Sequence, residues 1–175
     1  MFAAIHNTFG DPIQVMEVAD VTTPDPAAGQ VLVKMILSPI HNHDLWTVRG
    51  EYGYKPALPA AIGGTEAVGV ITDVGAGVDE AMIGQRVAVA GINGTWAQYF
   101  VAPAIGVMPL PPQIEDTLGA QLIAMPFSAI SLLESLDVSA GDWVVQTAAN
   151  GAVGKIMAVL AKARGVNLLN LVRRD

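Results

Sequence analysis

Two of the three histidines of the chain lie in one short stretch, SPIHNHDLWTVRG, which covers residues 38–50. One residue separates His41 from His43, and Asp44 follows directly. On an extended backbone, residues i and i+2 point to the same side, so both rings could face one ligand. An imidazole exchanges protons near neutral pH and is also a common metal ligand. The stretch therefore predicts a proton relay, a hydrogen bond to substrate or a metal site, unless one His only bonds the backbone of its loop.

Carboxylates lie near enough in the sequence to complete a metal site. Asp44, or Glu66 in the segment GGTEAVG, would bring the set to three or four nitrogen and oxygen ligands, which is enough for an open catalytic site. Thiolate ligands are excluded because the chain has no Cys. We favour the proton relay or substrate hydrogen bond and predict no metal. Glu66 would then act on the proton path or hold its loop by accepting N–H bonds.

Three aromatic side chains are candidates for contact with a substrate. A phenol keeps its proton at neutral pH, so Tyr52 could donate a proton or a hydrogen bond. Trp46 and Trp96 offer large apolar faces that could line a substrate pocket. Each of the three could equally be a packing residue, which is the ordinary role of an aromatic side chain.

A glycine-containing turn, QTAANGAVG, follows an apolar strand and opens a helix, which is the context of a dinucleotide-binding fingerprint. The pattern Ala148-x-x-Gly151-x-x-Gly154 provides a tight turn, a bare backbone for a pyrophosphate and close packing of helix on strand. The start of the helix adds unpaired N–H groups and the positive end of a dipole. A tight turn in any doubly wound fold would have the same pattern. The predicted cofactor contacts here are Ala148, Asn150, Gly151, Ala152, Val153 and Gly154.

Arg173 and Arg174 follow the next predicted strand, NLLNLV, about 20 residues beyond the turn, where an NAD site carries an acidic residue. A guanidinium fork suits a ribose 2′-phosphate better than a pair of hydroxyls. Asp175 keeps NAD open as the alternative. The sequence therefore favours NADPH as the cofactor, with both arginines at its 2′-phosphate.

The elements that must position these residues change in kind near residue 112. Before it, short apolar runs between Gly- and Pro-containing turns are typical of a small β-barrel or sandwich, with the histidine stretch as a loop that could contain one helical turn at residues 43–50. After it, helical spacing predicts one helix over 113–125, a second that Ser128 could cap, and then one βαβ unit. The predicted strands of the first part cover residues 1–6, 13–21, 30–37, 66–78, 85–91 and 95–103. The predicted domains are residues 1–125 and 126–175.

The helix of the βαβ unit, residues 152–164, is expected to bury one apolar face, formed by Ile156, Val159, Leu160 and Ala163. A parallel sheet of two strands would leave its edges and one face bare. We therefore expect the chain to be part of a longer protein or to need a partner.

Composition narrows the class of protein. Hydrophobic residues make up 52% and charged residues 14%, which predicts a large core and argues against disorder. A net charge of −7 with scattered basic residues argues against a nucleic-acid partner. No apolar run is long enough for a membrane span, and the N-terminus lacks the regions of a signal peptide. The absence of Cys is compatible with a reducing compartment, so we expect a cytoplasmic protein that acts on a small molecule.

Several blocks together resemble the medium-chain dehydrogenase/reductase superfamily, in which a GroES-like domain precedes a Rossmann domain. They are GQVLVKMILSPIHNHD, LPAAIGGTEAVGVITDVGAGV, IGQRVAVAGINGTWAQYFV and GDWVVQTAANGAVG. The resemblance covers the whole chain and implies an α/β protein, with an N-terminal GroES-like β-barrel-type domain followed by the start of a Rossmann dinucleotide-binding domain. Members are much longer, so it also implies a truncated chain and, for the full-length form, a homodimer.

Zinc-dependent members of this superfamily carry Cys at the place of His41, His at the place of Thr65 and Cys near Met125, and none of these is retained. The chain is more similar to the zinc-independent branch of quinone oxidoreductases and 2-enoyl thioester reductases. Blocks similar to RGEYGYKPALP, GINGTW and MPFSAISLL occur in the latter. His41 and His43 replace an Asn and a Ser that are usual in that branch.

The resemblance implies NADPH-dependent reduction of an activated C=C bond or a quinone by hydride transfer. It places Tyr52 near the reacting double bond and the hydroxyl of Ser128 at the nicotinamide, with His41 and His43 shaping the site. Two alternatives stay open. One is a metal-dependent alcohol dehydrogenase with an altered His/carboxylate site, and the other is a non-catalytic NADPH-binding homologue.

Overall fold

The computed structural model describes residues 1–173 of the chain. The chain divides into two compact units, Met1–Gln121 and a second unit that starts at Leu122. The sequence predicts the boundary between residues 125 and 126. The second unit starts earlier because helix α4 begins at Ala124 and packs within that unit.

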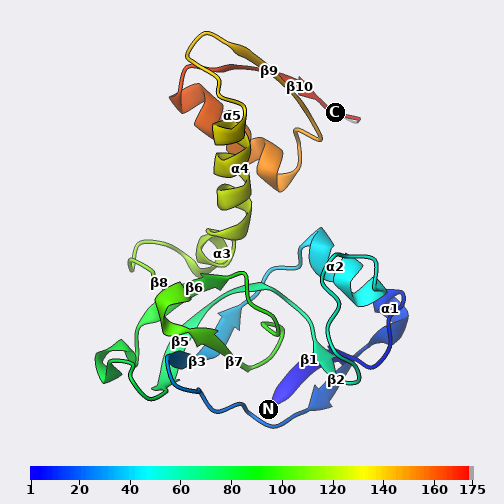
Figure 1. The fold of residues 1–175 in the computed structure, drawn as a ribbon, viewed down its shortest axis with the longest axis vertical. Helices are drawn as coiled ribbons and strands as arrows, with labels where there is room; N and C mark the ends of the chain where they lie inside the picture. Colours follow the sequence, from blue (N-terminus) through cyan, green and yellow to red (C-terminus); the bar gives the residue numbers. More distant parts are fainter. Residues whose placement is uncertain (174–175) are drawn as a thin grey trace. The chain divides into compact units, whose positions relative to one another are not determined.

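The first unit is built mainly from short antiparallel strands (Figure 1). Strands β2, β1 and β4 form one sheet, and β7, β3, β5, β6 and β8 form the other, in these orders. The strands are β1 Phe2–His6, β2 Met16–Asp20, β3 Gln30–Leu37, β4 Ala61–Ile62, β5 Glu66–Val74, β6 Arg86–Ala90, β7 Tyr99–Pro103 and β8 Met108–Pro109. The helices are α1 Pro12–Val15, α2 Asn42–Arg49, η1 Glu80–Met82, η2 Ala104–Gly106 and α3 Asp116–Gly119.

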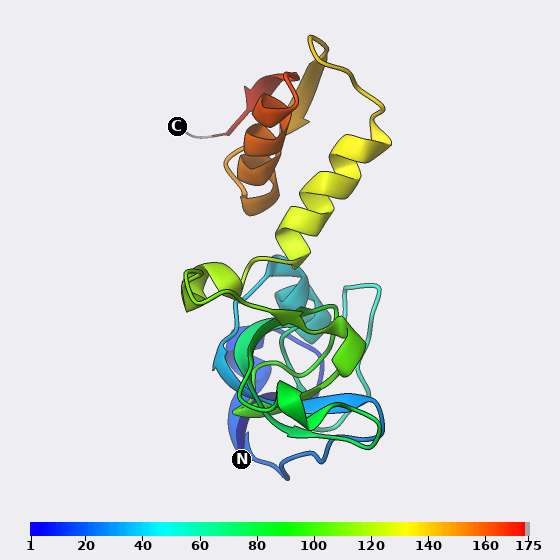
Figure 2. The ribbon, with the colours of Figure 1, turned by 90° about the vertical axis from the view of Figure 1, so that its left-hand side faces the viewer.

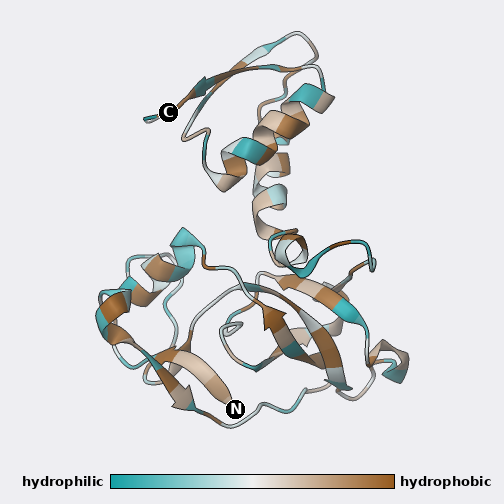
Figure 3. Ribbon diagram, turned by 180° about the vertical axis from the view of Figure 1, so that it is seen from behind, coloured by the Kyte–Doolittle hydropathy of each residue, from teal (hydrophilic) through white to brown (hydrophobic). Residues whose placement is uncertain are grey.

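The main core cluster of the first unit lies against the larger sheet. Alternate residues are buried in β3 and β7, as the period of two along a strand requires, whereas β5 and β6 bury consecutive residues on both faces. In Figure 3 several strands of the first unit carry the hydrophobic colour, as do parts of the helices. The buried cluster consists of Val31, Val33, Ala67, Ile71, Val87, Val89, Phe100 and Ala102.

Three predicted elements of the first unit differ in the structure. The predicted strand 13–21 begins only at Met16, because Asp11 caps the short helix α1 by accepting from the backbone N–H of Ile13, and Pro12 follows the cap. The histidine stretch is helical over more than the one turn expected at residues 43–50, because α2 occupies Asn42–Arg49. The single helix predicted over 113–125 is wrong, because the short helix α3 ends at Gly119 and α4 begins only at Ala124.

The second unit contains two helices and a pair of parallel strands, as the βαβ pattern predicts (Figure 2). The elements are α4 Ala124–Ser135, β9 Trp143–Thr147, α5 Ala152–Ala163 and β10 Asn167–Leu171. Helices α4 and α5 pack together through Ala129, Leu133 and Met157. Ser128 does not cap α4, because it lies inside the helix and its hydroxyl donates to the carbonyl of Ala124 at 2.9 Å.

The apolar face of α5 is rotated from the predicted one. Met157 and Ala161 are buried, whereas Val159 is 69% exposed. The strand pair carries exposed apolar side chains at Trp143, Val145 and Leu169, which is the bare sheet face expected for two parallel strands. None of the helices described for residues 1–173 is long and apolar enough to cross a membrane.

Candidate active site

The N-terminus of α2 positions both histidines of the first unit. His41 is the N-cap residue in extended conformation, and His43 lies in the first turn of the helix. The carboxylate of Asp44 accepts from the backbone N–H of His41 at 2.9 Å, which satisfies a donor that the helix leaves unpaired. The i, i+2 argument from an extended backbone is therefore wrong. The rings nevertheless stack, with centroids 5.1 Å apart and planes 24° from parallel.

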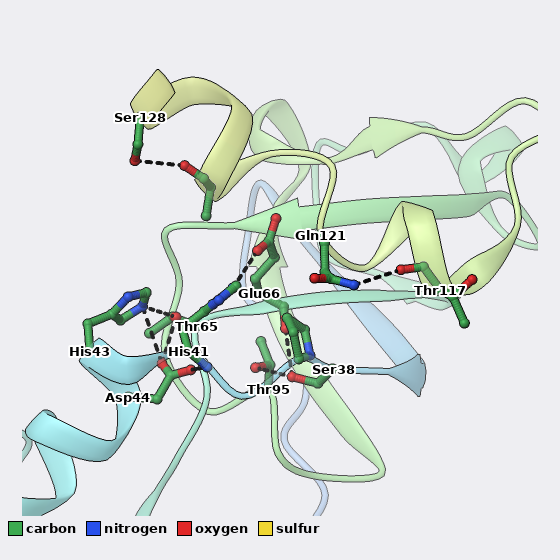
Figure 4. Close-up of polar contacts among 12 residues, drawn as sticks. Ser38, His41, His43, Asp44, Thr65, Glu66, Thr95, Thr117, Gln121 and Ser128 are labelled. Carbon is green, nitrogen blue, oxygen red and sulfur yellow. Dashed lines mark hydrogen bonds and ion pairs between the residues drawn. The ribbon is translucent and has the colours of Figure 1, made fainter. Parts of the chain in front are cut away.

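His41 pairs with a buried carboxylate on the neighbouring sheet. Its Nε2 lies 2.7 Å from Oε2 of Glu66, at the start of β5 (Figure 4). The side chain of Glu66 has no exposed surface and that of His41 is 10% exposed. A buried carboxylate needs such a charge-assisted partner, so Glu66 holds His41 in place and shields it from solvent.

His43 bonds a different acceptor. Its Nε2 lies 2.8 Å from the hydroxyl of Thr65, and that hydroxyl donates to Oδ1 of Asp44 at 2.8 Å. Asp44 Oδ1 is also 3.4 Å from His43 Nε2. Figure 4 shows this group beside the pair formed by His41 and Glu66. The two histidines thus share a stack but have separate hydrogen-bond partners.

The structure brings Tyr52 to the same place. Its ring stacks on His43 with centroids 5.7 Å apart and planes 29° from parallel. Tyr52 is 45% exposed, which leaves it open to a small molecule. Tyr52, His43, His41 and Glu66, the four predicted catalytic residues, therefore form one contiguous row in the first unit.

The two tryptophans have different environments. The indole N–H of Trp96 donates to the carbonyl of Pro39 at 3.1 Å, and its ring covers Gly63 and Gly64, where an added Cβ would come within 2.4 Å or less of that ring. These contacts explain Trp96 as a packing residue of the Gly-Gly turn. Trp46, on α2, is 49% exposed.

Within residues 1–173, no group of three or more His, Asp or Glu side chains is arranged to hold a metal ion. The donors that could have formed one are paired with each other. His41 bonds Glu66, whereas His43 and Asp44 share the hydroxyl of Thr65.

The second unit carries the predicted dinucleotide turn. A cleft of about 610 Å³ opens where β9 and β10 end, and it is lined by Thr147, Ala148, Asn150, Leu171, Val172 and Arg173. Three of the predicted cofactor contacts are in this set. The carboxyl ends of parallel strands are where doubly wound folds bind their ligands.

The local geometry of the turn fits the role predicted for its small residues. Gly151 is the N-cap of α5 and bonds the carbonyl of Ala148 at 2.9 Å, and no side chain caps the helix, so its first N–H groups remain for a ligand. A Cβ on Gly154 would lie 2.7 Å from the backbone of Ala149. Ala148 has φ +52°, a conformation that favours Gly.

The structure gives less information on the remaining residues predicted to contact the cofactor. Ser128 bonds its own helix and lies in the second unit, as the cleft does. Ala152 and Val153 form the first turn of α5. Arg174, predicted to hold the 2′-phosphate with Arg173, lies outside the described residues.

Comparisons with known proteins agree with this arrangement. The domain family "Alcohol dehydrogenase GroES-like domain" matches residues 27–112. The mitochondrial enoyl-[acyl-carrier-protein] reductase of Xenopus tropicalis is 33% identical over 172 residues, which are 97% of this chain and 49% of the relative. The chain belongs to the medium-chain dehydrogenase/reductase superfamily.

Solved structures support the same placement within the superfamily. The mycobacterial protein Rv1454c, in complex with NADPH, is 29% identical with a TM-score of 0.90, covering 99% of this chain and 53% of that one. The quinone oxidoreductase of Pseudomonas syringae is 26% identical with a TM-score of 0.91, over 99% and 53%. This medium-chain dehydrogenase/reductase is therefore similar to quinone oxidoreductases and enoyl reductases, and the predicted α/β fold class is confirmed.

The chain spans about half the length of the relatives it matches. It holds the GroES-like domain and, in the second unit, one βαβ unit.

Sequence patterns did not reveal the supporting hydrogen bonds of this medium-chain dehydrogenase/reductase. In the sequence, Thr65 stood out only because it occupies the position of a zinc-ligating His, yet its hydroxyl connects His43 to Asp44 by two hydrogen bonds. Ser38 donates to the carbonyl of Glu66 at 2.6 Å and bonds Thr95 at 3.0 Å, which fixes the start of β5. Single Ser and Thr residues carry no recognisable spacing, so only the fold identifies their partners.

Proposed function

We propose that the full-length protein is an NADPH-dependent oxidoreductase that reduces an activated C=C bond or a quinone by hydride transfer. The single observation that carries the proposal is the cleft at the ends of β9 and β10, where the bare turn and Arg173 line one wall. Relatives named as enoyl and quinone reductases give the substrate class. A homodimer and a cytoplasmic location, both expected above, belong to this proposal.

The second unit would hold the cofactor. The backbone of Gly151, Ala152 and Val153 at the start of α5 would bind the pyrophosphate, and Gly154 keeps the helix close to the strand loop. Arg173, on the cleft wall, would pair with the 2′-phosphate, together with Arg174. Asn150 lines the same cleft, and Ser128 would contact the nicotinamide side.

The reduction needs a hydride and a proton. NADPH, when bound, supplies the hydride to the carbon β to the carbonyl group, and the electron pair of the double bond moves toward the carbonyl oxygen. A donor must stabilise that oxygen, and a proton must reach the α carbon. Tyr52 would do one of these two tasks, because it is exposed and stacked on His43. Trp46 would offer an apolar wall for the acceptor.

The proposal is tested by following NADPH oxidation by the full-length protein against an enone, a 2-enoyl thioester and a quinone, with metal content measured on the same preparation. We expect turnover with at least one acceptor that survives removal of metal by a chelator. A stoichiometric zinc whose removal abolishes turnover would favour the alcohol dehydrogenase alternative. NADPH binding without oxidation of any acceptor would favour the non-catalytic one.

A further inference from the structure

The hydrogen bonds around His43 fix which of its ring nitrogens is available for chemistry. We propose that Thr65 and Asp44 hold His43 with its proton on Nε2, and that Nδ1 of His43 is the atom that exchanges a proton at the site. This inference deepens the proposed function and rests on it for the reaction served. The tautomer itself depends only on the chain described here.

The direction of each hydrogen bond follows from donor and acceptor chemistry. A carboxylate only accepts, so the hydroxyl of Thr65 gives its single proton to Oδ1 of Asp44 at 2.8 Å. Thr65 Oγ1 can then only accept from His43 Nε2, which lies 2.8 Å away. Nε2 of His43 must therefore carry a proton, and in the neutral ring Nδ1 is left with a lone pair.

Asp44 is itself constrained to act as acceptor. It is 2% exposed, and its other oxygen, Oδ2, accepts from the backbone N–H of His41 at 2.9 Å. Because this bond also belongs to the start of α2, folding of the helix places the carboxylate. The relay Asp44–Thr65–His43 is thus built from the helix N-terminus and the turn before β5.

Nδ1 of His43 is on the open side of the ring. Within residues 1–173, Nδ1 of His43 has no hydrogen-bond partner. Every buried side-chain nitrogen and oxygen of these residues does have a partner, so Nδ1 must be exposed to solvent. The side chain is 27% exposed. The rings of His41 and Tyr52 stack on His43, and Asp44 is the charged group nearest its Nε2, at 3.4 Å. Glu66 pairs with His41.

The chemistry balances as a simple proton cycle. The protonated ring gives the proton on Nδ1 to the substrate anion formed by hydride transfer, or to Tyr52 after the phenol has given up its own. The neutral ring that remains keeps its Nε2 proton and recovers the other one from solvent. Thr65 and Asp44 are positioning residues in this cycle, because they act through His43.

The tautomer is tested by long-range ¹H–¹⁵N correlation spectra of the histidine rings in the 175-residue chain at a pH where they are neutral. The chain has only three histidines, so a His41→Asn variant assigns the signals. We expect His43 as the Nε2–H form in the parent and in Thr65→Ser, which keeps the hydroxyl, and a mixture of tautomers in Thr65→Val. An Nδ1–H form in the parent, or no change in Thr65→Val, would overturn the proposal.

A second arm measures the reaction in full-length protein. His43→Gln should lower kcat by about 100-fold, and Thr65→Val should lower kcat more than it raises KM and change the pH profile of kcat, with Thr65→Ser restoring both. If the spectra agree but no variant changes turnover, the relay exists without the proposed reaction. If turnover is present in the parent and insensitive to His43, Nδ1 is not the exchanging atom.

Discussion

The Nε2 atom of His41 lies 2.7 Å from Oε2 of Glu66, a carboxylate whose side chain has no exposed surface. Removing one member of a buried pair that includes a carboxylate typically costs about 3 kcal/mol of folding free energy. We expect His41→Leu to destabilise the first unit by about that amount in urea unfolding followed by circular dichroism.

A double-mutant cycle distinguishes a specific interaction between His41 and Glu66 from ordinary side-chain packing. His41→Leu combined with Glu66→Leu should cost less than the sum of the two single variants, because each single variant already removes the shared contact. Additive losses would mean that the 2.7 Å contact carries no coupling energy.

The turn Gly63-Gly64 is a second position where adding a single Cβ atom should lower stability. Gly64 has φ +88°, and an added Cβ would lie 2.4 Å from Thr95 Oγ1 and from the Trp96 ring. Gly64→Ala should therefore destabilise the first unit by about 3 kcal/mol, from backbone strain and overpacking together.

Gly77 is the matched control, because it has φ +81° with nothing within 4 Å of an added Cβ. Thermal unfolding of Gly77→Ala should show a loss of about 1 kcal/mol, from the backbone alone. Equal losses of stability in Gly64→Ala and Gly77→Ala would show that packing of Trp96 against the turn contributes nothing.

The parts of the fold that sequence patterns predicted are those that depend on local periodicity. The runs around Val31, Ile71 and Val87 form buried strands because their apolar residues face the core, on alternate positions in β3 and on consecutive positions in much of β5 and β6. The strand, turn and helix around Gly151 also follow from local signals. The rotated face of α5 was missed because Val159 fits the apolar pattern yet nothing covers it in the described chain.

The sequence identified the residues of the candidate site but not the contacts between them. His41, His43 and Asp44 were singled out by their spacing, yet a helix rather than a loop positions them, and the capping bond from the His41 N–H to Asp44 was not foreseen. The partners Glu66 and Thr65 lie more than 20 residues away along the chain and meet the histidines only through the packing of α2 beside β5. Long-range pairing of this kind has no local signature.

The packing of α5 against its preceding turn gives a prediction for the second unit. A Cβ on Gly154 would lie 2.7 Å from backbone atoms of Ala149, which cannot rotate away, whereas a Cβ on Gly151 would be 3.2 Å from the carbonyl of Ala148. Gly154→Ala should destabilise the second unit by about 2 kcal/mol, and Gly151→Ala by less. Tryptophan fluorescence of Trp143, recorded in chains where Trp46 and Trp96 are replaced by Phe, reports unfolding of this unit. The reverse order of the two losses would contradict the close approach at Gly154.

Arg173 provides the test of cofactor choice. It lines the cleft beside Ala148 and Asn150, where a guanidinium would meet the 2′-phosphate of NADPH. In full-length protein, Arg173→Ala should raise the Kd for NADPH at least tenfold and leave the Kd for NADH nearly unchanged, because a charge-assisted bond of about 1.5 kcal/mol is lost for NADPH alone. Lys162→Ala, which removes a positive charge from the exposed last turn of α5, is the matched control and should change neither value. Calorimetric titration with both dinucleotides measures the four constants. Equal weakening of NADPH and NADH in Arg173→Ala would show that the arginine does not discriminate at the 2′ position.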